Sequence, residues 1–309
     1  MLDQYKFHQM TFTWLDGVKL NTDGGTLFGP VPKTLWSRYY PSNELNQIPT
    51  TTDPILIQYQ NKNYLIDASL NLEKLTKKQQ KNMGVHADGD ITGSLQKLNL
   101  TPEDIDVVLM THMHNDHAGG LTHYKNGKLK SFYSNAKIFV NAIEWEEAQN
   151  PNDRTRNTYL KENWEPIQKQ VETFDQEIEI APGMTMVHTG GHSRGHSRIR
   201  FEQEGETMLH LSDLLVTFTH TNPLWVPALD DYPMDSIAAK KEILKEAFAH
   251  KYRLLFYHDI FYRVLEYTPD GKNIQFALKN STLSSIPMTK KQDKGPREVD
   301  KYENSFKNL

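Results

Sequence analysis

One short stretch constrains this chain more than any other. Three histidines and an aspartate lie within six residues: His112, His114, Asp116 and His117. They follow residues 105–111, an apolar run suited to a buried strand. In an extended chain His112 and His114 point to the same side, and Asp116 and His117 lie where the backbone can turn away. This spacing is typical of metal ligands, and its position after a strand favours a functional site.

The composition excludes several alternatives. The sequence has no cysteine, so any metal must be held by histidine and carboxylate, without disulfides or thiolate sites. A net charge of −4 with mixed signs leaves no basic stripe for nucleic acid or an anionic membrane. We find no apolar run of about 18 residues and no basic-then-apolar start. We therefore expect a cytoplasmic protein that does not contact membranes.

Strand patterns recur along the chain, and several end in ligand-type residues. Residues 55–67 predict a hairpin, and 142–149 predict a helix. The later predicted strands at 184–188, 208–211 and 253–257 are followed by His192, Asp213 and His258. The complete set therefore has five imidazoles and two carboxylates, each near the end of a strand.

Seven ligands are too many for one tetrahedral zinc ion. They fit two metals about 3.5 to 4 Å apart that share a carboxylate and a solvent ligand. Binding to metal lowers the pKa of water from about 15.7 to about 7, so a bridging hydroxide can attack a carbonyl carbon or phosphorus. The residues therefore predict a hydrolase that needs no serine or cysteine nucleophile.

The order and spacing of these residues resemble the metallo-β-lactamase superfamily over about residues 50–260. The resemblance rests on His112-x-His114-x-Asp116-His117, Gly190-Gly191-His192-Ser193-Arg194-Gly195-His196, Asp213 and His258. Other segments are similar to the YtnP-like branch of bacterial N-acyl-homoserine lactone lactonases: Leu35-Trp36-Ser37, Asp53-Pro54-Ile55-Leu56-Ile57, Thr189-Gly190-Gly191-His192-Ser193, Asn222-Pro223-Leu224-Trp225 and Asp230-Asp231-Tyr232-Pro233-Met234. This narrower resemblance covers nearly all of the chain before about residue 280.

The resemblance implies an αββα sandwich: two mixed sheets face to face, helices outside, and a dinuclear site along one edge. The sequence itself predicts one domain over residues 1–280 with an arm at about 21–50, followed by a polar tail at 281–309. One metal would be held by His112, His114 and His192, and the other by Asp116, His117 and His258. Asp213 would bridge them, and Asp116 would also pass a proton to the leaving alkoxide. Zinc is the expected metal, with iron, manganese and cobalt as alternatives.

The implied activity is opening of the lactone ring of N-acyl-homoserine lactones. The alternatives are phosphotriester hydrolysis at the same site and a metal-binding protein without turnover. β-Lactam and thioester cleavage use related sites, whereas RNA processing is disfavoured by the missing basic surface. One departure concerns substrate binding: well-studied lactonases carry a tyrosine three residues after the bridging aspartate, and this chain has Val216 there.

Other residues are expected to support the site or the substrate. His196 and Asp67 are expected to hydrogen-bond to ligands from behind. His220 and Trp225, shortly after the bridging aspartate, are candidates to line the pocket. Phe28 and Trp36 on the arm can cover an acyl chain or pack against a partner in a homodimer, and we favour dimer packing.

Overall fold

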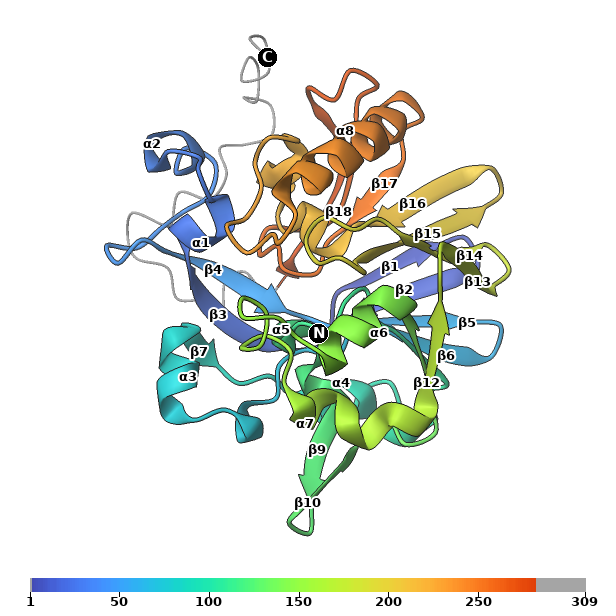
Figure 1. Cartoon of the computed structure of the whole chain (residues 1–309). Coiled ribbons are helices and arrows are strands. Elements are labelled where there is room, and N and C mark those ends of the chain that lie inside the picture. The colour runs from blue at the N-terminus through green and yellow to red at the C-terminus, as the bar shows by residue number, and fades with distance from the viewer. Residues whose placement is uncertain (1, 282–309) are drawn as a thin grey trace.

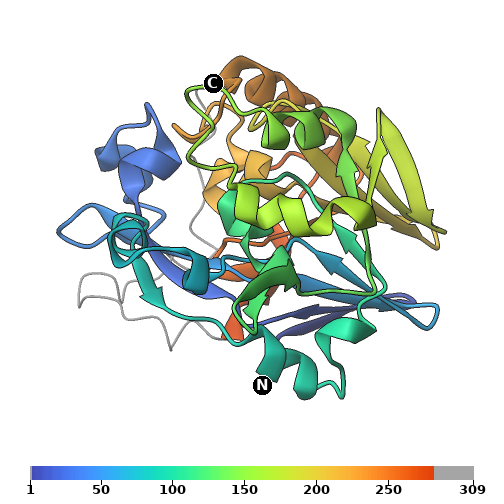
Figure 2. The ribbon, with the colours of Figure 1, turned by 60° about the horizontal axis from the view of Figure 1, so that its bottom comes forward.

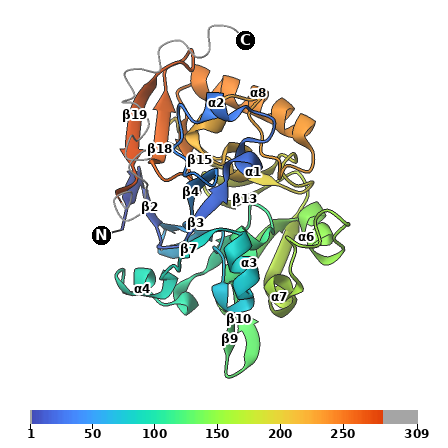
Figure 3. The same cartoon turned by 90° about the vertical axis from the view of Figure 1, so that its left-hand side faces the viewer.

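The computed structural model describes residues 2–281 and shows two seven-stranded sheets packed face to face (Figures 1 and 3). The first sheet has, in order, β1 (Gln4–Phe7), β2 (Met10–Trp14), β5 (Ile55–Tyr59), β6 (Lys62–Ile66), β8 (Val107–Leu109), β11 (Lys137–Asn141) and β12 (Val171–Phe174). The second has β13 (Glu177–Ala181), β14 (Met184–His188), β15 (Ser197–Gln203), β16 (Glu206–His210), β17 (Arg253–Leu255), β18 (Tyr262–Tyr267) and β19 (Ile274–Lys279). Both sheets are mixed, since β6, β8, β11 and β12 pair in parallel in the first, as do β16 and β17 in the second.

Alternating apolar residues explain why both faces of the sheets are buried. In β5, Ile55 and Ile57 belong to the core between the sheets, whereas Leu56 packs on the outer side of the first sheet. In β17, Leu255 faces the core between the sheets and Leu254 the outer side of the second. Successive side chains of a strand point to opposite faces, so such runs need cover on both sides.

Helices supply that cover. The outer core of the first sheet includes residues of α4 (Ile91–Gln96), α5 (Asn115–Ala118) and α6 (Ala142–Gln149). The outer core of the second includes residues of α8 (Pro233–Ala249). The predicted αββα sandwich is therefore confirmed.

Smaller elements extend from this body. The strands β3 (Val18–Asp23), β4 (Gln47–Thr52) and β7 (Val85–Ala87) form a three-stranded sheet, and β9 (Thr122–Lys125) with β10 (Lys128–Ser131) forms a hairpin that projects from the body (Figures 1 and 3). The remaining helices are α1 (Gly24–Phe28), α2 (Lys33–Trp36), α3 (Lys77–Asn82) and α7 (Lys161–Trp164). No helix within residues 2–281 is long and apolar enough to cross a membrane. The predicted tail lies, beyond Ser281, outside the described residues.

The arm at residues 21–50 contains α1 and α2 and lies on the opposite side of the molecule from β13 and β14 (Figures 1 and 2). Two of its aromatic residues, Phe28 and Trp36, differ from the expectation. Phe28 and Trp36 are buried and stack on each other, with ring centroids 4.6 Å apart, in the core that also contains Leu244 of α8. The expectation that these rings pack against a dimer partner is wrong, because the same polypeptide already covers them. A homodimer contact through the rest of the arm stays a prediction, and Leu35 and Leu45 are its exposed apolar residues.

Candidate metal centre

The candidate ligands lie where strands of both sheets end. The strands β14, β16 and β17 run in the same direction, because β14 and β16 each pair antiparallel with β15 and β17 pairs in parallel with β16. Their carboxyl ends therefore meet at one edge, and His192, Asp213 and His258 follow them. Asp213 lies in the 3₁₀ helix η5 (Ser212–Leu215). The first sheet supplies the other ligands after β8: His112 and His114 precede α5, and Asp116 and His117 lie in α5 itself.

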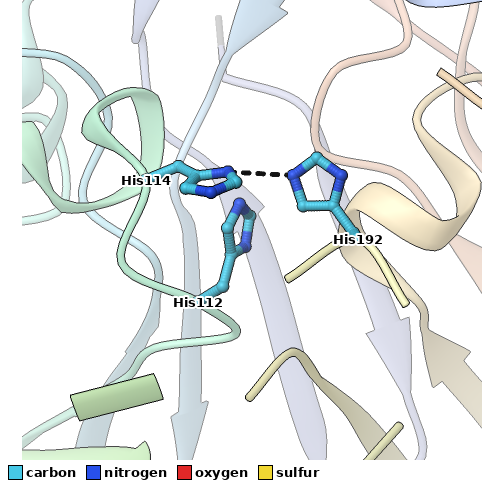
Figure 4. Close-up of side chains that lie close together, drawn as sticks. All are labelled: His112, His114 and His192. Carbon is cyan, nitrogen blue, oxygen red and sulfur yellow. Dashed lines mark hydrogen bonds between the residues drawn. The ribbon is translucent and has the colours of Figure 1, made fainter. Parts of the chain in front are cut away.

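Three histidines form the first group: His112, His114 and His192. One ring nitrogen of each lies within 4.8 Å of those of the other two. Nδ1 of His114 is 3.0 Å from Nε2 of His192, and the three rings converge (Figure 4). All three side chains are buried, so the protein itself fixes this arrangement.

Two histidines and two aspartates form the second group: Asp116, His117, Asp213 and His258. Nε2 of His117 lies 3.1 Å from Nε2 of His258. Oδ2 of Asp116 approaches the same two nitrogens at 3.9 and 3.7 Å. Asp116 is the most solvent-exposed member of this group, because its side chain is 30% exposed whereas that of His117 is fully buried.

Asp213 lies between the two groups and directs one carboxylate oxygen to each. Oδ2 is 3.3 Å from Nε2 of His192 and 4.0 Å from Nε2 of His112. Oδ1 is 3.3 Å from Nε2 of His117 and 3.2 Å from Nε2 of His258. This is the geometry that a carboxylate bridging two cations requires.

Hydrogen bonds behind the rings determine which nitrogen of each histidine carries the proton. Nδ1 of His258 is 2.6 Å from the carbonyl oxygen of Thr51, which can only accept, so this nitrogen donates. Nδ1 of His192 likewise faces the carboxylate of Asp230 at 2.9 Å. With Nδ1 donating in both rings, their Nε2 atoms are the ones that face the centre and can bind a metal ion.

Asp67 organises the same pattern for two further ligands. Its Oδ2 is 2.8 Å from Nδ1 of His117 and accepts a hydrogen bond from the Thr111 hydroxyl, also at 2.8 Å. Because that hydroxyl donates to Asp67, it can accept from Nδ1 of His112, 3.1 Å away. Nε2 of His112 and of His117 then also face inward as lone pairs.

Burial and neighbouring charges shift the pKa values of these side chains in different directions. Burial lowers the pKa of His112 and His114 well below the usual value for histidine. Burial also disfavours a charge on His117, but nearby carboxylates, first that of Asp213, raise its pKa well above the usual value. Burial would raise the pKa of Asp213, yet the surrounding imidazoles hold it well below its usual range. An ionised Asp213 attracts cations, and a cation that binds His117 would displace the proton that the carboxylates favour there.

The donor set fits two divalent cations. Nε2 of His112 and Oδ1 of Asp213 are buried and have no hydrogen-bond partner among residues 2–281. Leaving such groups without a partner costs about 1–3 kcal/mol each, which coordination to a cation would offset. Five imidazoles and two carboxylates suit zinc and its neighbours in the first transition row. The two His/Asp groups are thus consistent with a dinuclear metal site.

Comparison with known families agrees with this geometry. The sequence model of the metallo-beta-lactamase superfamily matches residues 49–257, which is more than half of the chain. The chain belongs to this superfamily. The matched region contains every candidate ligand except His258.

The chain is also similar to three individual proteins. A crystal structure of a probable metal-dependent hydrolase from Staphylococcus aureus is 42% identical, with a TM-score of 0.86, and the match covers 90% of this chain and 99% of that one. An N-acyl homoserine lactonase from Bacillus cereus is 30% identical over 54% of this chain and 60% of its own length. The chain thus spans about 60% of the curated relatives it matches. AidC, a dizinc quorum-quenching lactonase, shares the fold with a TM-score of 0.72 at 18% identity, covering 86% and 93% of the two chains.

In this member of the superfamily, His196 lies beside the metal groups without joining either. Its ring centroid is 5.4 Å from that of His112, and its Nδ1 is 2.7 Å from the Thr189 hydroxyl. That hydroxyl donates to the carbonyl oxygen of His196, so it accepts from Nδ1. His196 therefore packs against a ligand instead of hydrogen-bonding to it.

The four candidate substrate-binding residues form one aromatic cluster, in which His220 and Trp225 pack against Phe28 of the arm, which itself stacks on Trp36. His220 is buried, stacks on Phe28 at 5.2 Å, and has its Nε2 2.8 Å from the carbonyl oxygen of Leu27. Trp225 packs edge-on against Phe28 at 5.9 Å and is only partly buried. The structure therefore gives Phe28, Trp36 and His220 a packing role, and only Trp225 keeps an exposed surface.

Three supporting residues escaped the sequence analysis. Asp230 holds His192, and Tyr257 stacks on His117 with centroids 4.6 Å apart. Tyr257 directly precedes a ligand, which is the only signal that points to it in the sequence. Glu144 lies in the first turn of α6, where an acidic residue is an ordinary feature of helices.

Proposed function

We propose that this protein is a metal-dependent hydrolase that opens the lactone ring of N-acyl-homoserine lactones. The observation that carries the proposal is the position of Asp213, with one oxygen directed at each ligand group. Two divalent cations bound there, zinc by preference, would supply an activated water nucleophile and polarise the lactone carbonyl. The similarity to Bacillus lactonases and to AidC supports the lactone as substrate.

Asp116 is the residue proposed to complete the reaction. Breaking the ring C–O bond leaves an alkoxide, which must take up a proton. The Asp116 side chain is 30% exposed, compared with 8% for Asp213, so a substrate can reach it. The Tyr257 hydroxyl donates to the Asp116 backbone carbonyl at 3.1 Å and keeps the aspartate in place. The proton that the attacking water gives up can then pass through this carboxylate to the leaving oxygen.

Val216 offers no hydrogen bond to the substrate carbonyl, and its side chain is buried. The role that the resemblance gives to a tyrosine at this position is therefore absent. The cations alone would then polarise the substrate carbonyl. We expect a preference for esters whose hydrolysis needs no hydrogen bond from a protein hydroxyl to that carbonyl.

Leu229 and Tyr232 replace the arm residues as proposed contacts of the acyl chain. Both are exposed apolar side chains, and they flank Asp230 and Asp231. The Asp231 amide donates to the carbonyl oxygen of His192 at 3.0 Å, which ties this segment to a metal ligand. Substitution of Leu229 or Tyr232 by aspartate is expected to raise KM for lactones with long acyl chains more than for those with short ones.

The test is a ring-opening assay on zinc-loaded protein with N-acyl-homoserine lactones of several chain lengths. Asp116→Asn and Asp213→Ala serve as inactive controls, and a paraoxon-type triester is assayed in parallel. Lactone opening that is lost in both variants supports the proposal. Faster triester cleavage would favour the phosphotriesterase alternative. If the zinc-loaded protein hydrolyses neither substrate, the remaining interpretation is a metal-binding protein without catalytic activity.

A further inference from the structure

Glu144 is a fully buried carboxylate, and its oxygens accept three hydrogen bonds. The Met113 amide donates to Oε1 at 2.7 Å, and the Tyr159 hydroxyl donates to the same oxygen at 2.8 Å. The Ser193 hydroxyl donates to Oε2 at 2.6 Å. No ion pair to Glu144 occurs within the described part of the chain. A buried charge is costly unless donors compensate it, so three donors on one carboxylate indicate a specific role.

Two of the three donors belong to the two loops that form the three-histidine group. Met113 lies between His112 and His114, and Ser193 directly follows His192. Tyr159 adds a further contact, because its ring centroid is 5.1 Å from that of His114. One carboxylate thus joins a loop after β8 to a loop after β14, which come from different sheets.

The backbone is shaped so that this contact can form. A Cβ atom at Gly195 would lie 2.1 Å from the Glu144 backbone nitrogen, so only glycine allows the loop to approach α6 this closely. Asn141 caps α6 by accepting from the Ile143 amide, which leaves the Glu144 side chain free to turn towards the loops. The partial positive charge at the helix N-terminus also stabilises a carboxylate there.

We infer that Glu144 is a positioning residue that sets the distance between His112, His114 and His192 and thereby the affinity of one of the two cation sites. The inference rests on the proposed metal centre. It concerns one site only, because the ligands of the other group are held by different partners. His117 is held by Asp67, and His258 by the carbonyl oxygen of Thr51.

The experiment measures metal binding, not turnover. Metal-free wild type, Glu144→Ala and Glu144→Gln are titrated with Zn²⁺ against a chromogenic chelator, and Co²⁺ absorption reports the ligand geometry. Loss of such supporting bonds typically weakens metal binding by about 10–100-fold. We expect Glu144→Ala to weaken the binding of one of the two zinc equivalents by that factor. The affinity for the other equivalent should stay unchanged. Glu144→Gln should lie between, because its amide oxygen can still accept from Met113 and Tyr159.

The matched control is Glu146→Gln, an exposed carboxylate on the same helix, which should bind both equivalents as the wild type does. If Glu144→Ala does not fold, Glu144→Gln and Ser193→Ala decide, since Ser193→Ala removes a single donor. Weakening of one equivalent in these variants supports the role. Unchanged binding of both equivalents, or equal weakening of both, would overturn it.

The titration also separates this role from the proposed reaction. Wild type that binds two cations but opens no lactone would contradict the reaction, and the variants would still decide the role of Glu144. Wild type that opens lactones while the Glu144 variants keep two unchanged equivalents would contradict only the positioning role.

Discussion

Nδ1 of His117 lies 2.8 Å from Oδ2 of Asp67, and neither side chain has any exposure to solvent. Asp67 also accepts hydrogen bonds from the Thr111 amide and hydroxyl. One carboxylate therefore orients both the residue before His112 and the His117 ring. The backbone of Asp67 has a φ of 53°, a conformation that asparagine and aspartate adopt more readily than other non-glycine residues. Position 67 therefore needs both an acceptor and a residue that tolerates the left-handed region.

The first prediction concerns this pair. Asp67→Asn keeps the backbone conformation but removes the charge that fixes the proton on Nδ1 of His117. We expect about 10–100-fold weaker binding at the site containing His117. Asp67→Ala should do the same and also lower stability by about 1–2 kcal/mol through backbone strain. Metal titration with urea unfolding of the metal-free forms separates the two effects. Equal metal affinity in wild type and Asp67→Asn would contradict the orienting role.

The second prediction compares Asp213 with His192. Asp213 faces both groups, whereas His192 belongs to one, so Asp213→Ala should weaken both equivalents and His192→Ala mainly one. Elemental analysis after dialysis against limiting zinc gives the metal content of each variant. His250→Ala, at an exposed histidine outside both groups, is the control. Two tightly bound metals in Asp213→Ala would rule out the bridging position.

The third prediction tests the packing role of the arm. Phe28 is fully buried between Trp36 and His220, so Phe28→Ala should destabilise the protein by about 3–5 kcal/mol. Leu35→Ala, at a residue 41% exposed on the same arm, should change stability by no more than about 0.5 kcal/mol. Urea unfolding measures both. A Phe28→Ala variant of wild-type stability with a raised KM would instead favour the substrate-binding interpretation.

The fourth prediction is a pH dependence of stability. Burial lowers the pKa of Lys240 to about 7, and among residues 2–281 its ammonium donates only to the carbonyl oxygen of Trp225, 2.6 Å away. In the unfolded chain this pKa is about 10.4, so between the two values the unfolded state binds more protons. Stability should therefore rise as the pH increases from about 7 to about 10, with the cost of the buried charge fully present at lower pH.

Lys240→Met should flatten this rise, and Lys241→Met, at the exposed neighbour, should leave it unchanged. The measurement is urea unfolding of metal-free protein over that pH range. Parallel curves for wild type and Lys240→Met would show that Lys240 is not the group that titrates.

The sequence predicted those elements whose signals are local. The strand at 184–188 and the helix at 142–149 coincide with β14 and α6, because periodicity, length and capping residues act within a few positions. The hairpin at 55–67 appears as β5 and β6 for the same reason. The spacing within residues 112–117 likewise carries its chemistry in a single loop.

Interactions between distant residues were beyond that reasoning. His220 was a pocket candidate because it follows Asp213 closely, yet its Nε2 meets the carbonyl oxygen of Leu27, 193 positions earlier. The donors to Glu144 come from residues 15, 31 and 49 positions away. An apolar side chain such as Phe28 suits a substrate pocket, a dimer contact and a core equally well. Only the folded chain shows which surface covers it.

The ligands come from both halves of the chain, His112 to His117 from the first sheet and the other three from the second. A cation held by both halves is therefore a crosslink between the sheets, and its binding free energy adds to the free energy of folding. We therefore expect local opening at this edge to cost more free energy in the metal-loaded protein than in the metal-free protein. Proteases that cleave the locally opened state should then act more slowly on the loaded form.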